Sequence, residues 1–138
     1  MLLYHFTKAW QEIEAVGVIE ARWPETLDGL FTTRFVHLSR SDSVESLPEA
    51  IRRDVRERIT VEIPDTEAVA WLPWLRQNYP QGEWILGDKP RTLAGTVVRD
   101  GDASQWYVTP RAIPTMQWLT TVDFDSGSVL WMPGSHGR

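Results

Sequence analysis

The sequence predicts a single α+β domain over residues 1–138. The length is that of one ordinary domain, and neither a linker nor a domain-sized repeat divides the chain. Strand and helix patterns alternate up to residue 80, and three strand patterns close the chain, which is the element order of an α+β fold. A hydrophobic fraction of 42% and a charged fraction of 24% are typical of a globular protein with one core.

The first strand and helix are expected at the start of the chain. Residues 2–6, LLYHF, are apolar and aromatic, a pattern typical of a buried strand. Thr7 is a suitable N-cap for a helix over residues 8–17, in which apolar residues recur at helical spacing before Gly17 ends it. The first histidine is therefore expected near a strand end, just before a helix.

The next segments predict a loop, a strand and a second helix. Residues 18–33 contain proline and glycine and are expected to form a loop. Residues 34–41, RFVHLSRS, predict the second strand. Residues 41–57 show helical spacing, although Pro48 limits where that helix can begin.

A third strand and helix are expected after residue 57. Apolar and polar residues alternate over 58–65, RITVEIPD, which predicts a half-buried strand. Asp65 or Thr66 can cap a helix over residues 67–80, which an internal proline is expected to bend. Residues 81–104 are rich in glycine, proline, aspartate and arginine and predict loops.

The chain is expected to close with three strands. Residues 105–109, QWYVT, are aromatic and β-branched, as strands commonly are. Segments 120–124 and 128–132 flank the turn sequence DSG and predict a hairpin. Residues 133–138 predict a frayed tail.

The composition excludes several classes of function. A net charge of −5 argues against a broad nucleic-acid or anionic membrane surface, which needs clustered lysine and arginine. The absence of cysteine excludes disulfides, thiol nucleophiles and cysteine–zinc sites. No apolar run approaches a membrane span, no secretory signal pattern is present, and a cytoplasmic protein is expected. Most of the eight tryptophans are expected in the core, while one or two could stack on a flat ligand.

Two of the three histidines lie in one local pattern, YHFT at residues 4–7 and VHLS at residues 36–39. Because side chains alternate along a strand, each histidine and the hydroxyl residue two positions later point to the same face. An imidazole beside a hydroxyl suits phosphate oxygens or ribose hydroxyls. Our hypothesis is that the two pairs face one cleft.

One chemical interpretation of the pair is a two-histidine phosphoesterase. His5 and His37 would act as general base and general acid, and the hydroxyls would hold the phosphate. The two histidines are only 32 positions apart (37 − 5), however, with one expected helix between them. The phosphoesterase fold resembles two duplicated lobes, which need a longer intervening segment.

A second interpretation comes from a resemblance. The segments LYHFTKAWQEIEAVGVI and FVHLS, within residues 1–40, resemble the ADP-ribosyltransferase-like superfamily. They are similar to a small bacterial family with an N-terminal strand, a Trp-bearing helix and a FIHLS-type strand, and to transferases that modify DNA bases. The resemblance returns at SQWYVTPRAIP. It implies split antiparallel sheets with flanking helices, and NAD held in a cleft between two small sheets.

The resemblance also implies roles for the residues of the two tetrapeptides. His5 would contact the ribose hydroxyls of NAD, and Thr7 the nicotinamide ribose or its neighbour. The strand over residues 35–39 would form the wall of the nicotinamide pocket, with Ser39 or His37 close to the nicotinamide. The cleft would be built from this strand, the first strand and the QWYVT strand.

Further positions complete the expected site. Relatives that transfer ADP-ribose carry a late glutamate that stabilises an oxocarbenium-like transition state. Gln105 stands at that place, before Trp106, which could stack on a ring, and a neutral amide supplies no such charge. Glu83 also precedes a tryptophan and is a second candidate with a weaker strand signal. Of the arginines that bracket the second strand, Arg40 is the better placed to pair with a pyrophosphate.

The predicted function is binding of NAD or a related ADP-ribosyl nucleotide, with transfer of ADP-ribose as a further hypothesis. The alternatives are phosphoester hydrolysis and a non-catalytic nucleotide-binding or interaction module. The expected partner is a small nucleotide. No metal site is predicted, because Asp123 and Asp125 fit a turn. The arginines of IRRDVRERI, over residues 51–59, alternate with acidic residues and predict a solvated surface of mixed charge.

Overall fold

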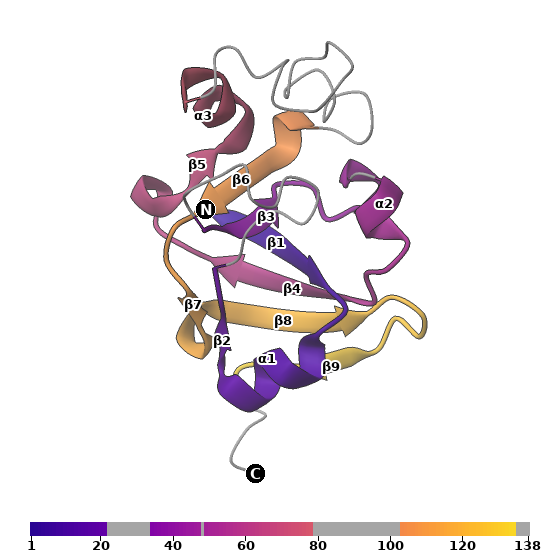
Figure 1. Cartoon of the computed structure of the whole chain (residues 1–138). Helices are drawn as coiled ribbons and strands as arrows, with labels where there is room; N and C mark the ends of the chain where they lie inside the picture. The colour runs from indigo at the N-terminus through magenta and orange to yellow at the C-terminus, as the bar shows by residue number, and fades with distance from the viewer. Residues whose placement is uncertain (22–33, 48, 79–102, 135–138) are drawn as a thin grey trace.

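The computed structural model of the chain describes residues 1–21, 34–47, 49–78 and 103–134. They form an α+β fold with two antiparallel sheets (Figure 1). The strands of the larger sheet are β1 (Leu2–Thr7), β3 (Val36–Ser39), β4 (Glu57–Glu62), β5 (Val69–Ala70), β6 (Trp106–Thr109), β8 (Trp118–Asp123) and β9 (Val129–Trp131). The smaller sheet pairs β2 (Val18–Ile19) with β7 (Ile113–Pro114).

The larger sheet has the strand order β5-β6-β3-β1-β4-β8-β9, so the N-terminal strand lies in its middle (Figure 1). Strand β1 pairs with β4 along its whole length, from Leu2 opposite Glu62 to Thr7 opposite Glu57. Its pairing with β3 is confined to one residue pair, Tyr4 with Ser39. The sheet is therefore continuous but loosely joined between β1 and β3.

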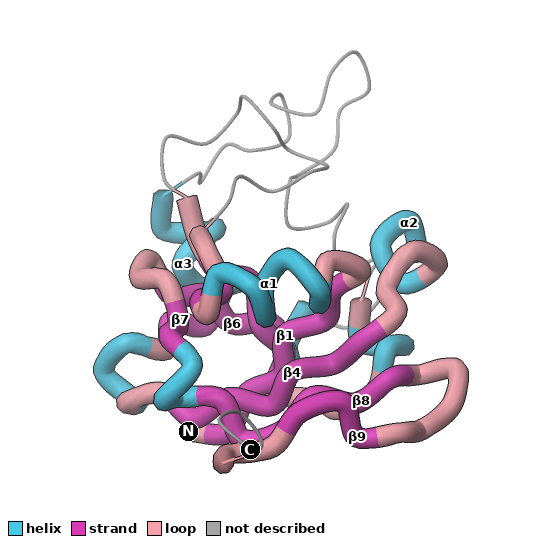
Figure 2. The backbone as a smooth tube through the Cα atoms, turned by 90° about the horizontal axis from the view of Figure 1, so that it is seen from below, coloured by secondary structure: helices cyan, strands magenta, loops and turns pink. Residues whose placement is uncertain are grey.

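The core lies between one face of the sheet and the helix α1 (Trp10–Val16) (Figure 2). Trp10 of the helix packs on Trp118 of β8, with ring centroids 5.7 Å apart, and Trp118 contacts Trp131 at 5.5 Å. Leu3 and Ile59 are fully buried beside them. Several tryptophans therefore fill the core, as the composition predicts.

The connection from β1 to α1 differs from the prediction. The helix begins at Trp10, and Thr7 is not its N-cap but the last residue of β1. The Thr7 Oγ1 accepts the N–H of Ala9 at 2.9 Å, and the Glu57 carboxylate accepts the N–H of Trp10 at 3.3 Å. Gly17 ends the helix as predicted, because its φ of 82° lies in the left-handed region that side chains rarely adopt.

The second predicted helix is much shorter than expected. Within residues 41–57 the structure has a 3₁₀ turn at Val44–Ser46 and one α-helical turn, α2 (Glu49–Arg52). Upstream, three serine hydroxyls each accept the backbone N–H two residues later, in the pairs 39–41, 41–43 and 43–45. Such local bonds compete with helix formation, which explains the loss of the first turns.

The third predicted helix also begins later. Residues 65–67 form a 3₁₀ turn and β5 follows, so α3 (Trp71–Asn78) begins without the predicted caps. Pro73 then stands in the first turn of α3, where backbone N–H groups have no helical partner, and it need not bend the helix.

The remaining strand predictions are confirmed with shifted ends. Residues 58–65 give β4, and the closing hairpin is β8 with β9. The centre of β4 is more buried than predicted, because Thr60 is buried as well as Ile59 and Val61 on the other face. Gln105 ends a 3₁₀ turn, Ala103–Gln105, and β6 follows it.

One predicted loop contains a strand, and other predictions concern residues that the structure does not describe. Strand β2 lies in a stretch predicted as loop, because Val18 and Ile19 pair with Pro114 and Ile113. Most of the predicted loops, Glu83, and the end of the predicted tail lie outside the described residues. In the part of the chain that the structure describes, no helix has the length and apolar character to span a membrane.

Candidate functional site

The three strands predicted to build the site are neighbours in the sheet (Figure 1). Strand β3 lies between β1 and β6, with Ser39 opposite both Tyr4 and Trp106. His37 lies opposite Val108 of β6. The predicted site residues therefore come from adjacent strands, and the register decides which of them share a face.

The two histidines point to opposite faces of the sheet. Because Tyr4 is opposite Ser39, the antiparallel register places His5 beside Leu38 and Phe6 beside His37. The first face, which we call the core face, packs against α1 and carries Leu3, His5, Thr7, Val36, Leu38 and Ile59. The second, which we call the aromatic face, carries Tyr4, Phe6, Phe35, His37, Ser39, Arg58 and Trp106. The hypothesis that both tetrapeptides face one cleft is therefore wrong.

His5 joins the two strands where their backbones pair least. Its Nδ1 lies 2.9 Å from the backbone oxygen of His37. A carbonyl oxygen can only accept, so Nδ1 of His5 carries a proton and donates this bond. The ring of His5 thus supplies a cross-strand hydrogen bond between β1 and β3.

The hydroxyl of Thr7 is engaged within the chain. Thr7 is buried, and its Oγ1 accepts the Ala9 N–H that begins the turn into α1. Across the strand, burial raises the pKa of Glu57, and the hydrogen bond from the Trp10 N–H opposes that rise. This end of the core face therefore holds the start of α1 in place.

The ring of His37 lies among aromatic side chains. Phe35 presents a ring edge to it at 6.5 Å, and Phe35 in turn contacts Trp74 of α3 at 4.9 Å. The Nε2 of His37 is enclosed and has no hydrogen-bond partner among the described residues. Burial and, to a smaller extent, the nearby His5 together lower the pKa of His37 to about 4. At neutral pH the ring is therefore uncharged.

Ser39 and Trp106 are joined through a third residue. Ser39 is fully buried, and its Oγ lies 3.0 Å from the Oγ of Ser46 and accepts the Ser41 N–H at 3.1 Å. The indole N–H of Trp106 donates to the Ser46 backbone oxygen at 2.6 Å, and its ring lies 5.3 Å from that of Trp71. The polar atoms of Ser39 and Trp106 therefore fix the loop after β3, while the Trp106 ring faces the aromatic cluster.

Gln105 and Arg40 meet through their backbones. The Arg40 N–H donates to the Gln105 backbone oxygen at 2.7 Å, which ties the end of β3 to the start of β6. The Arg40 side chain is exposed, and that of Gln105 is partly buried. Gln105 thus stands at the start of β6, one residue before Trp106.

The structure brings together one part of the predicted site and leaves out another. His37, Ser39, Arg40, Gln105 and Trp106 gather on or beside the aromatic face, whereas His5 and Thr7 belong to the core face. Phe35, which belongs to the strand predicted as the pocket wall, lies on this face with His37. Residues not predicted for the site join the first group, namely Tyr4, Phe6, Arg58, Trp71 and Trp74. Their place beside it depends on contacts between residues distant in sequence.

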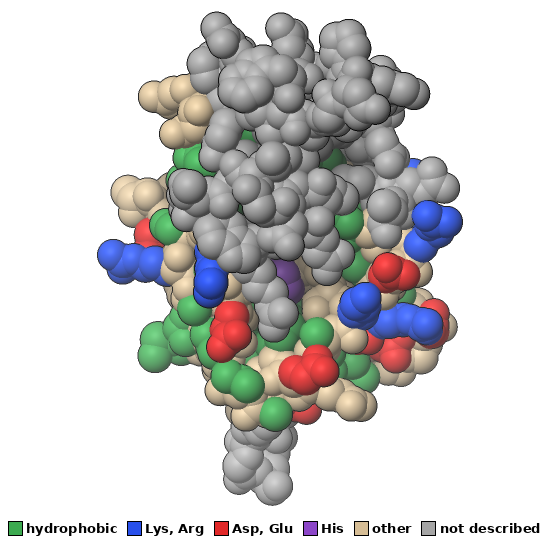
Figure 3. Space-filling view, viewed as in Figure 1, with side chains coloured by type: hydrophobic (Ala, Val, Ile, Leu, Met, Phe, Trp, Pro, Cys, Tyr) green, Lys and Arg blue, Asp and Glu red, His purple; other side chains and the backbone are tan. Residues whose placement is uncertain are grey.

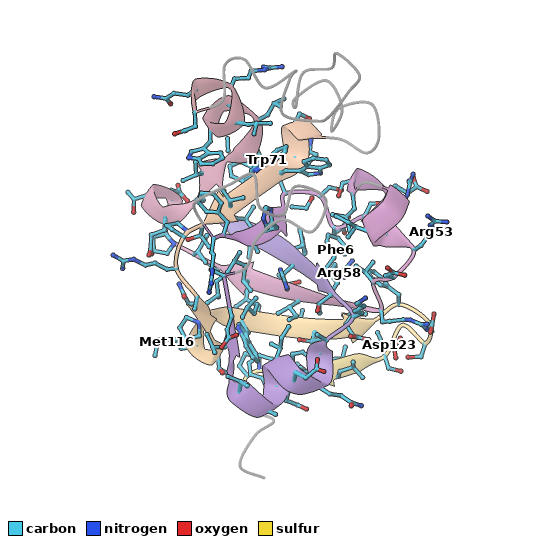
Figure 4. The ribbon with its side chains drawn as sticks, in the orientation of Figure 1. Phe6, Arg53, Arg58, Trp71, Met116 and Asp123 are labelled. Carbon is cyan, nitrogen blue, oxygen red and sulfur yellow. The ribbon has the colours of Figure 1, made fainter. Side chains whose placement is uncertain are left out.

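A separate apolar groove of about 530 Å³ lies beside the core tryptophans. It is lined by Glu14, Thr115, Met116, Trp118, Leu119, Trp131, Pro133 and Gly134. Met116 is 88% exposed at its rim (Figure 4), in the region where hydrophobic side chains gather at the lower left of Figure 3. None of the predicted site residues lines this groove.

Comparison with known proteins adds no relative. No group of three or more histidine, aspartate or glutamate side chains within the described ranges could hold a metal ion. No protein-family model, curated protein or solved structure matches the chain.

Proposed function

We propose that the protein binds NAD or a related ADP-ribosyl nucleotide on the aromatic face of β1, β3 and β6. The observation that carries this proposal is the enclosed Nε2 of His37, unpaired within the described residues, in a ring that lies beside Phe35, which in turn contacts Trp74. An enclosed polar atom without a partner costs free energy, so a ligand atom that pairs with it is favoured. A nicotinamide or adenine ring offers both a flat apolar surface and hydrogen-bonding atoms on its edge.

The charge state of His37 favours recognition over proton transfer. With its pKa lowered to about 4, His37 is neutral near pH 7 and is poorly matched to act as a general acid there. A neutral ring edge can instead form one hydrogen bond to an amide or amine of a base. We therefore assign His37 to ring recognition in this proposal.

Gln105 favours binding without turnover. Transfer of ADP-ribose needs stabilisation of positive charge at the ribose, and the neutral amide of Gln105 offers far less than a carboxylate. We expect stoichiometric binding with little nicotinamide release. Transfer to an acceptor remains a hypothesis that the Gln105→Glu variant tests.

Phosphoester hydrolysis by the histidine pair has weaker support. An acid–base pair has to reach the same reacting group from within hydrogen-bond distance. His5 and His37 lie on opposite faces, and the Nδ1 of His5 is already bonded to the His37 backbone.

Isothermal titration with NAD, ADP-ribose and nicotinamide tests the proposal. Wild-type protein is expected to bind NAD saturably with one site per chain, and His37→Gln to bind it at least about tenfold more weakly, the value of one lost hydrogen bond in a buried site. The matched variant His5→Gln carries the same change on the core face. Retained binding in His5→Gln assigns recognition to His37, whereas loss in His5→Gln alone would support the sequence-based role of His5 instead.

The same samples distinguish an enzyme from a binding protein. Nicotinamide release is followed by chromatography in wild type and in Gln105→Glu. Nicotinamide release by Gln105→Glu alone would identify the start of β6 as a transfer site that is inactive because it carries glutamine. No binding of NAD or ADP-ribose by folded wild-type protein would overturn the proposal and leave an interaction module as the better hypothesis.

A further inference from the structure

Arg58 of β4 is a partly buried cation without an anionic partner. Its Nη1 donates to the neutral backbone oxygen of Asp42 at 3.0 Å. Its Nε is enclosed and has no hydrogen-bond partner among the described residues. Two other arginines do have carboxylate partners, Arg56 with Asp125 at 3.4 Å and Arg111 with Glu67 at 3.5 Å. Arg58 takes part in no ion pair within the described ranges of the chain.

The surroundings of Arg58 fix the guanidinium without neutralising it. Its Cζ lies 5.4 Å from the ring centroid of Tyr4, a distance at which a cation is attracted to the face of an aromatic ring. Phe6 lies directly opposite Arg58 on β1, and the two are adjacent in Figure 4. Enclosing part of a charged group away from water is costly unless an opposite charge compensates, so this site favours an anion.

Arg58 lies in the same cross-strand row as His37. The register places His37 of β3 beside Phe6 of β1, and Phe6 is opposite Arg58 of β4. With neighbouring strands about 4.8 Å apart, two steps separate the backbones of His37 and Arg58 by about 10 Å. Both side chains point to the aromatic face, so one ligand with a ring at one end and a phosphate at the other can reach both.

We propose that Arg58, held over the Tyr4 ring, binds the diphosphate of the nucleotide whose ring His37 recognises. This rests on the proposed function, and it names the phosphate-binding residue of that site. Arginine suits the role because its planar fork donates two parallel hydrogen bonds to phosphate oxygens. Arg40, the arginine expected from the sequence, has an exposed side chain and contributes its backbone N–H to the fold.

The sequence does not single out Arg58, because the neighbouring residues are charged as well. Arg58 belongs to the run IRRDVRERI, whose alternating charges predict a solvated surface. That prediction suits Arg56, whose side chain is 64% exposed and pairs with Asp125. For Arg58 it fails, because β4 turns this side chain onto the sheet between Tyr4 and Phe6.

The test compares Arg58→Gln with the matched control Arg56→Gln by isothermal titration with ADP-ribose, adenosine and inorganic pyrophosphate. We expect Arg58→Gln to weaken ADP-ribose binding by roughly tenfold or more, the scale of a lost charge-assisted hydrogen bond, and to leave adenosine binding unchanged. Arg56→Gln should change ADP-ribose binding less than about twofold, because exposed ion pairs contribute little. Arg58→Lys keeps the charge and should bind with intermediate affinity, and circular dichroism checks that each variant is folded.

The outcomes separate this inference from the proposed function. Equal ADP-ribose affinity in folded wild type and Arg58→Gln would overturn the role of Arg58 while NAD binding stands. The wild-type protein could instead bind pyrophosphate but neither NAD nor ADP-ribose, with Arg58→Gln abolishing the pyrophosphate binding. That result would overturn the proposed nucleotide ligand and support Arg58 as an anion site. If Arg56→Gln and Arg58→Gln weakened ADP-ribose binding equally, the effect would come from the overall surface charge, and the inference would be overturned too.

Discussion

The tetrapeptides YHFT and VHLS share a sequence pattern but differ in what their histidines do. The ring of His5 lies on the core face and donates a hydrogen bond to the backbone of the other strand. The ring of His37 lies on the aromatic face, uncharged, with an enclosed nitrogen that has no partner among the described residues. One histidine thus joins two strands of the sheet, and the other is the residue to which our proposal assigns ring recognition.

The hydroxyl residues of the two tetrapeptides, in contrast, do the same thing. Thr7 accepts the N–H of Ala9, and Ser39 accepts the N–H of Ser41, each two residues downstream. Both hydroxyls therefore close a local turn at the end of a strand. The shared sequence pattern therefore indicates two similar strand ends and not a shared cleft.

The largest expected difference between the two histidines is in the pH dependence of stability. The folded pKa of His37, about 4, lies below its ordinary value of 6.5, so the unfolded chain takes up the proton first. Stability from this group is present above pH 6.5 and is lost as the pH falls towards 4, by up to about 3 kcal/mol. The raised pKa of Glu57 acts in the opposite direction, since it favours the folded state as the pH falls.

Urea unfolding at several pH values between 4 and 7, followed by tryptophan fluorescence, measures this effect. His37→Gln is expected to flatten the pH dependence, whereas His5→Gln is expected to retain most of it, because burial is the larger cause of the lowered pKa of His37. If both variants kept the wild-type slope, the acid sensitivity would belong to other groups and the comparison of the histidines would lose its basis.

The next largest effect is expected for Ser39→Ala. This change removes the fully buried Ser39 hydroxyl, which is the acceptor of the Ser41 N–H and one neighbour of the Ser46 hydroxyl. The Ser46 hydroxyl keeps its bond to the Ser43 backbone oxygen. We expect the free energy of unfolding to fall by about 2 kcal/mol, the usual cost of unpaired buried polar groups. Urea unfolding at pH 7 measures it, and a loss below the error of the method would show that water replaces the serine.

A smaller effect is expected for Thr7→Val, which keeps the shape of the side chain. It removes one hydrogen bond, from the Ala9 N–H at the start of the turn into α1. The loss should be about 1 kcal/mol, comparable with the loss of a helix cap. A loss larger than that of Ser39→Ala in the same unfolding assay would contradict the ranking of the two strand ends.

The smallest effect on stability is expected for Arg40→Ala. The contribution of Arg40 to the fold is its backbone N–H, which the substitution keeps, while its side chain is exposed. The free energy of unfolding should change by less than about 0.5 kcal/mol. ADP-ribose affinity measured on the same variant compares Arg40 directly with Arg58, and a tenfold loss in Arg40→Ala would restore the residue expected from the sequence.

Local features of the fold could be predicted from the sequence, because they depend on residues close together in the chain. The alternation of side chains along a strand placed His5 with Thr7, and His37 with Ser39, correctly on common faces. The strands β1, β3, β4 and β6 and the closing hairpin have clear apolar or β-branched patterns. The end of α1 at Gly17 follows from the freedom of glycine in the left-handed region.

The tertiary structure alone decided how these local pieces combine. Whether His5 and His37 share a face depends on the register of β1 against β3, and a shift of one residue would reverse the answer. The two-residue strands β2, β5 and β7 exist only because a distant partner pairs with them. Arg58 differs from Arg56 for the same reason, since the absence of a nearby carboxylate among the described residues is a property of the folded chain. Patterns along the chain fix which side chains point together within a strand, but only pairing between strands fixes what each face of the sheet can bind.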